Sequence, residues 1–135
     1  MGVDEKFLQG NFLQEVSKVV VYTYRNCDTC RKAVKWLGRR GIEFTERPIR
    51  ETPPEVAELR TMLVALNGER RRLFNTSGTD YRELKLADKM PAISDAEVFQ
   101  LLSRNGNLVK RPFLLGPKIG LVGFDEQEWA RAFDP

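Results

Sequence analysis

Apolar and polar positions change their spacing several times along this chain, and each change marks an expected element. The β-branched and aromatic run Lys18–Tyr24 predicts a buried strand. Residues 31–40 carry apolar side chains at helical spacing and are followed by Gly41, which is typical of a helix that ends in a glycine. Ile42–Ile49 alternates again, so we expect a strand, a helix and a second strand parallel to the first.

The middle of the chain has helical spacing. The sequence TPPE, which begins at Thr52, is typical of a helix start with a capping hydroxyl and a proline in the first turn. An apolar stripe then runs to Leu66, and Asn67-Gly68 is expected to end that helix. Two further helices are predicted, at Tyr81–Lys89 and Ala96–Arg104.

The last third of the chain returns to extended segments. Leu108–Lys110 and Phe113–Leu115 are expected to be extended, and Ile119–Val122 is the expected hairpin partner of the second. Asp125 is a suitable cap for a final helix at Glu126–Phe133. The predicted order is β-α-β, a helical insertion, then β-β-α, which indicates an α/β protein with a thioredoxin-like mixed sheet.

The composition is that of an ordinary globular protein, with 41% hydrophobic and 30% charged residues in 135. We expect one domain over residues 18–135, preceded by an N-terminal extension over residues 1–17. No apolar run has the length of a membrane span, and no secretory leader pattern is seen, so no membrane contact is expected. The chain has only two cysteines, which favours a cytoplasmic location.

Charge and residue types narrow the chemistry. The formal net charge is +3, and the basic run at residues 70–72 is expected to be a solvated face or a contact for an acidic partner. No aromatic residues interleave with it, so direct nucleic-acid binding is not expected. The chain has no histidine, which excludes histidine acid–base catalysis and histidine metal ligands.

Cys27 and Cys30 form a C-x-x-C motif between the first predicted strand and the first predicted helix. A thiol at a helix start faces unpaired backbone N–H groups and the positive end of the helix dipole, which favour the nucleophilic thiolate. We therefore interpret the pair as a redox centre, with Cys27 as nucleophile and Cys30 as resolving thiol. A zinc site lacks further cysteine or histidine ligands. A pair of merely buried thiols is the remaining alternative.

Basic side chains supply candidate anion ligands. Arg25 and Arg31 flank the cysteines and either stabilise a thiolate, attract an oxyanion, or are simply solvated. Arg111 precedes Pro112 at the expected entry to a strand. The peptide bond there is either cis, a feature usually kept for a tight functional turn, or trans at a sheet edge. Arg111 is suited to bidentate binding of an oxyanion.

Motifs in order along nearly the whole chain resemble the arsenate reductase (ArsC) family, a branch of the thioredoxin superfamily that includes Spx-type transcriptional regulators. The matching segments are Tyr22–Ala33, Thr52–Pro54, Phe74–Leu84, Asn105–Pro112 and Val122–Trp129.

For the reductases, the resemblance implies that Cys27 attacks arsenate and that glutathione resolves the adduct, while three arginines hold the oxyanion. Only Arg111 matches an arginine of that clamp. Asn75 stands at the first arginine position, and Gly123 or a close neighbour stands at the last. Each lost charged hydrogen bond removes about 1.5–3 kcal/mol. We expect Asn75 and Pro112 to line the substrate site of an incomplete anion clamp.

The second cysteine resembles the Spx-type branch, in which C-x-x-C is a disulfide switch and Arg111 is implied to lie near it. Our first hypothesis is a cytosolic thiol–disulfide redox protein that uses glutathione or another thiol donor, with glutaredoxin or thioredoxin as partner. The alternative is a non-enzymatic, redox-sensing regulator that binds the RNA polymerase α-subunit. The third possibility is a structural member of the family in which the cysteine site is vestigial. No bound cofactor and no metal are expected.

Overall fold

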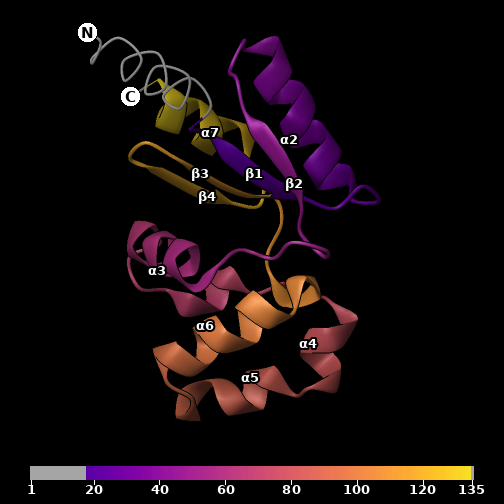
Figure 1. Cartoon of the computed structure of the whole chain (residues 1–135), viewed down its shortest axis with the longest axis vertical. Helices are drawn as coiled ribbons and strands as arrows, with labels where there is room; N and C mark the ends of the chain where they lie inside the picture. Colours follow the sequence, from indigo (N-terminus) through magenta and orange to yellow (C-terminus); the bar gives the residue numbers. More distant parts are fainter. Residues whose placement is uncertain (1–17, 135) are drawn as a thin grey trace, which may run out of the picture.

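The computed structural model describes residues 18–134, in which a four-stranded mixed sheet separates two groups of helices (Figure 1). The strand order is β2-β1-β3-β4, with β1 parallel to β2 and antiparallel to β3, and β3 antiparallel to β4. This arrangement confirms the predicted thioredoxin-like mixed sheet. The predicted extension over residues 1–17 lies outside the described residues. The strands are β1 (Val20–Thr23), β2 (Thr45–Pro48), β3 (Phe113–Gly116) and β4 (Ile119–Val122).

Helices cover both faces of the sheet. In Figure 1, α2 and α7 lie on one side, α3 lies on the other, and α4, α5 and α6 form a helical layer beyond α3. Short 3₁₀ turns connect them. The helices are α2 (Asp28–Arg39), α3 (Val56–Ala65), α4 (Thr79–Glu83), α5 (Leu86–Lys89), α6 (Asp95–Arg104) and α7 (Glu126–Phe133), and the turns are η1 (Arg70–Leu73), η2 (Met90–Ala92) and η3 (Gly106–Leu108).

The two sides of the sheet bury separate hydrophobic clusters, because neighbouring strand residues point to opposite faces. Val21 packs into the cluster under α2 and α7, where the rings of Trp36 and Trp129 lie 6.0 Å apart. Tyr22 packs into the cluster on the other face, with its ring 5.8 Å from that of Phe113. The strand β1 is therefore buried from both sides.

Some predicted boundaries are wrong, each for a local reason. The helix expected at Tyr81–Lys89 breaks into α4 and α5 because Lys85 has φ +54°, which is not helical. Thr52 is not the cap of α3: Glu55 is the N-cap residue and forms a capping box with Glu58. The residue before a proline avoids helical backbone, so this helix starts only after its two prolines.

Candidate functional site

Cys27 occupies the N-cap position of α2, with extended backbone (φ −113°, ψ 113°). Its Sγ accepts a hydrogen bond from the backbone N–H of Cys30 at 3.2 Å. The backbone N–H of Cys27 donates to the carbonyl oxygen of Tyr24 at 3.1 Å, which ties the cysteine loop to the end of β1. The sulfur thus caps the helix in the place of a serine or aspartate oxygen, and it is partly exposed.

Cys30 lies one turn into α2 and is buried, with 1% of its surface exposed. Burial, and after it the side-chain hydrogen bond with Cys27, raise the pKa of its thiol to about 12, since both favour the protonated form. Both cysteines are free thiols. The motif therefore joins a thiol that solvent reaches to a protonated thiol that solvent does not reach.

Arg111 reaches the cysteine end of the sheet from the loop before β3. The Arg111–Pro112 peptide bond is cis, one of the two conformations expected, and Pro112 is buried. The guanidinium of Arg111 lies 4.9 Å from the centre of the Tyr24 ring. Its positive charge partly offsets the rise in the pKa of Cys30, so the arginine is close enough to act on the C-x-x-C motif.

Arg50 is a second cation at the same ring, and the sequence analysis missed it. Its guanidinium lies 5.0 Å from the centre of the Tyr24 ring and donates to the phenol oxygen at 2.9 Å. Asn26 donates to that oxygen at 3.4 Å. The hydrogen bond from Asn26 lowers the pKa of Tyr24, as do the charges of Arg50 and Arg111. A signal was present, because residues that follow parallel neighbouring strands meet at one sheet edge, and Arg50 follows β2.

A polar hollow of about 410 Å³ opens beside these two arginines. It brings together Arg111 and Asn75, two of the residues singled out in the sequence. Asn75 is fixed there because its backbone N–H donates to the carbonyl of Leu108 at 2.7 Å. The hollow is lined by Tyr24, Arg50, Asn75, Ser77, Gly78, Thr79, Asp80, Asn107 and Arg111.

Arg25 and Arg31 do not line this hollow. Arg31 pairs with Asp28 on its own helix and donates to the carbonyl oxygen of Arg25. Arg25 is exposed and lines a neighbouring hollow of about 390 Å³ with Tyr24 and Arg50. A substrate role for these two arginines stays a prediction.

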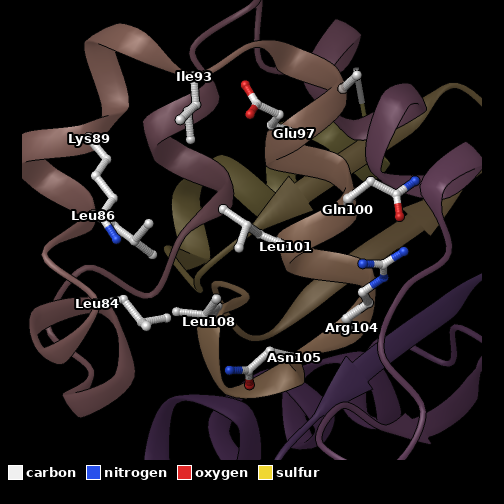
Figure 2. A pocket seen from close by; sticks show the side chains of 11 residues that line it. Leu84, Leu86, Lys89, Ile93, Glu97, Gln100, Leu101, Arg104, Asn105 and Leu108 are labelled. Carbon is white, nitrogen blue, oxygen red and sulfur yellow. The ribbon is translucent and has the colours of Figure 1, made fainter.

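A separate hollow of about 570 Å³ lies in the helical layer, between α6 and the segment that leads into α5. Leucine and isoleucine side chains point into it, and charged side chains such as Lys89 and Glu97 stand at its rim (Figure 2). Neither cysteine nor either arginine of the Tyr24 ring lines it. It is therefore distinct from the cysteine site.

Residues 18–134 contain no group of three or more cysteine, aspartate or glutamate side chains placed to hold a metal ion. Within the same residues, no helix is both long enough and apolar enough to cross a membrane.

A thioredoxin-like sheet with C-x-x-C at a helix start defines this class of protein, and comparison with known proteins identifies the family. The model of the ArsC family matches residues 22–132, so the chain belongs to the ArsC family. The uncharacterized protein YusI of Bacillus subtilis is 41% identical over 108 residues, or 80% of this chain and 92% of YusI.

Other relatives carry names from both branches of the family. The global transcriptional regulator Spx of Enterococcus faecalis is 30% identical over 114 residues, or 84% of each chain. The crystal structure of a possible arsenate reductase from Streptococcus mutans matches with a TM-score of 0.77 and 31% identity, covering 84% of this chain and 98% of that one. The resemblance stated from the motifs is thus confirmed at the level of the family.

Proposed function

We propose that the protein is a cytoplasmic thiol–disulfide redox protein in which Cys27 is the nucleophile and Cys30 the resolving thiol. The observation that carries the proposal is the asymmetry of the pair. The Cys27 sulfur is partly exposed at the start of α2 and accepts a hydrogen bond from the backbone N–H of Cys30 at 3.2 Å. The Cys30 thiol is buried and protonated. In the reducing cytosol both thiols are available for exchange.

The proposed reaction is an exchange with a substrate disulfide. The Cys27 thiolate attacks one sulfur, the substrate's S–S bond breaks, and the other sulfur leaves as a thiolate. Cys30 then gives up its proton and attacks the Cys27 sulfur, which releases the second substrate thiolate. The substrate gains two electrons, and the protein holds a Cys27–Cys30 disulfide until a thiol donor such as glutathione, with glutaredoxin or thioredoxin, reduces it.

Single-cysteine variants test this assignment. Under oxidising and then reducing conditions, the wild-type protein is expected to lose and regain two thiols, and the potential of that couple is measured in glutathione buffers. Cys30→Ser is expected to trap a mixed disulfide at Cys27, and Cys27→Ser to form none. A Cys27–Cys30 disulfide that does not form at any glutathione ratio would contradict the proposal.

Arsenate is one substrate to try in the same framework. Turnover with glutathione and glutaredoxin that is abolished by Cys27→Ser would identify a reductase of small oxyanions. The absence of arsenate turnover with every thiol donor would exclude the arsenate reductase.

A regulator is the second proposed function, and the identity with Spx over 84% of both chains favours it. In that role the oxidised protein binds the C-terminal domain of the RNA polymerase α-subunit without turning over a substrate. A pull-down with that domain is expected to retain the oxidised wild-type protein more strongly than the reduced one. Equal retention of both forms, or of neither, would reject the redox-sensing regulator.

A further inference from the structure

Two guanidinium groups meet at the Tyr24 ring without a carboxylate between them. Arg50 and Arg111 lie 5.0 and 4.9 Å from its centre. Among residues 18–134, neither arginine forms an ion pair with an acidic side chain. Arginines elsewhere in the described chain do have such partners: Arg31 with Asp28, Arg40 with Asp134, Arg47 with Glu58, Arg70 with Asp95 and Arg72 with Glu69.

The fold holds these two cations together from different elements. Arg50 follows β2 and Arg111 precedes β3, and both strands pair with β1, which leads to Tyr24. Gly106 packs directly against the backbone at Arg50: a Cβ on this glycine would lie 1.9 Å from the carbonyl oxygen of Ile49 and 2.9 Å from the Cα of Arg50. Both guanidinium groups line the same hollow, so an anion bound there would be attracted by both charges.

The hollow beside the arginines is larger than an inorganic anion needs. Its volume of about 410 Å³ falls within the range of sites for small organic molecules. Asn75, Ser77 and Thr79 line it with amide and hydroxyl groups, which suit a peptide-like ligand. Its acidic residue, Asp80, already accepts hydrogen bonds from the amides of Asn105 and Asn107, at 3.1 and 3.5 Å.

We propose that Arg50 and Arg111 form a subsite for the carboxylate of the small disulfide that reacts with Cys27. This inference rests on the proposed thiol–disulfide function and adds the class of substrate, a disulfide that carries a carboxylate. Arg50 thereby supplies a second cation where the resemblance to the reductases finds only Arg111. Planar guanidinium groups bind carboxylates through paired hydrogen bonds.

Two disulfide reagents, one with carboxylates and one without charge, test the subsite on the full-length reduced protein. The first, 5,5′-dithiobis(2-nitrobenzoate), is a disulfide with two carboxylates, and the second, 4,4′-dithiodipyridine, is an uncharged disulfide. Each reacts with Cys27 by releasing one thiolate or thione, and attack by Cys30 releases the second. The ratio of the two second-order rate constants measures carboxylate recognition, and the neutral reagent reports any change in the access to Cys27.

We expect Arg50→Gln to lower that ratio about five- to tenfold, and Arg50→Lys to restore part of it. Lys32→Gln, which removes a charge from the exposed face of α2, is the matched control and is expected to change the ratio less than about twofold. An unchanged ratio in Arg50→Gln, or an equal fall in Lys32→Gln, would overturn the subsite.

The same experiment distinguishes a failure of the proposed thiol–disulfide function from a failure of the carboxylate subsite. Release of only one equivalent of the reagent's thiol would show that Cys30 does not resolve the mixed disulfide. The dependence of the first step on Arg50 would still be measured, and a normal fall in the rate ratio would support the subsite.

Discussion

Two tyrosines at the end of β1 each bind an arginine that comes from β2 or the segment after it. The Arg47 guanidinium lies 5.8 Å from the centre of the Tyr22 ring and is 3.9 Å from Glu58, whereas Arg50 at the Tyr24 ring has no such carboxylate among the described residues. The arginine beside the buried Tyr22 ring is thus neutralised by a carboxylate, whereas the arginine beside the partly exposed Tyr24 ring is not. A neutralised pair stabilises the fold, and a positive pair is free to bind an anion.

Tyr22→Phe tests the neutralised pair. The Tyr22 hydroxyl donates to Glu58 at 2.7 Å and accepts from Arg47 at 3.0 Å, with only 1% of the residue exposed. We expect the free energy of unfolding to fall by about 1–2 kcal/mol in urea denaturation. Tyr24→Phe, at a partly exposed ring, is the control and is expected to lose less than about 0.5 kcal/mol. Equal losses in the two variants would contradict the assignment.

The sequence predicted Cys27, Cys30, Asn75 and Arg111 as site residues because each lies in a recognisable motif. The structure brings Asn75 and Arg111 to one hollow, which neither cysteine lines, and the charge of Arg111 acts on the pKa of Cys30. Arg50 was missed because it lies in none of these motifs: its place just after a predicted strand puts it at the right sheet edge, but does not link it to Arg111, 61 positions away in the numbering. The contact depends on both residues reaching the Tyr24 ring. Such a juxtaposition belongs to the tertiary structure.

At the scale of elements, the 3₁₀ turn η3 passes against the segment that follows β2. The closest approach is at Gly106, where an added Cβ would lie 1.9 Å from the carbonyl oxygen of Ile49 and 2.9 Å from the Cα of Arg50. Gly106 therefore allows η3 to approach the backbone at Ile49 and Arg50 more closely than a residue with a side chain could.

We expect Gly106→Ala to destabilise the protein by about 3 kcal/mol, because backbone atoms must shift to admit the methyl group. Gly38→Ala is the matched control: this glycine lies within α2, and an added Cβ meets nothing within 4 Å. That variant is expected to gain about 0.5–1 kcal/mol from helix propensity. Thermal and urea unfolding of both variants provide the comparison, and a Gly106→Ala protein as stable as wild type would refute the close approach.

The elements that were predicted well have strong local signals. The final helix begins at Glu126 after its Asp125 cap, and β4 matches the predicted Ile119–Val122. The predicted extended segment at Leu108–Lys110 is partly wrong, since Leu108 belongs to η3. The turn η3 contacts the segment after β2, which is distant in the sequence. The spacing of apolar residues carries no information about such a contact, so it could not predict the turn.

At the scale of the whole molecule, the site lies where the two layers of helices meet the sheet. The cysteines come from α2 on one side, and Asn75 comes from the helical insertion on the other. The polar hollow therefore depends on both halves of the chain being folded together. Elsewhere in the fold, burial raises the pKa of the Cys30 thiol and of the Tyr22 hydroxyl, so that both groups keep their protons.

These buried protons predict how the stability of the reduced protein depends on pH. Burial raises the pKa of Cys30 and of Tyr22 to about 12 each, whereas the unfolded values are about 8.5 and 10. Between those values and pH 12 the unfolded chain binds fewer protons than the folded one, so the free energy of unfolding falls as the pH rises. The Cys30 contribution is complete below about pH 8.5, and about 3 kcal/mol of it is lost by pH 10.5. Urea denaturation under a reductant is expected to show this slope in wild type and a shallower one in Cys30→Ala. Parallel slopes in the two proteins would show that the Cys30 proton does not stabilise the fold.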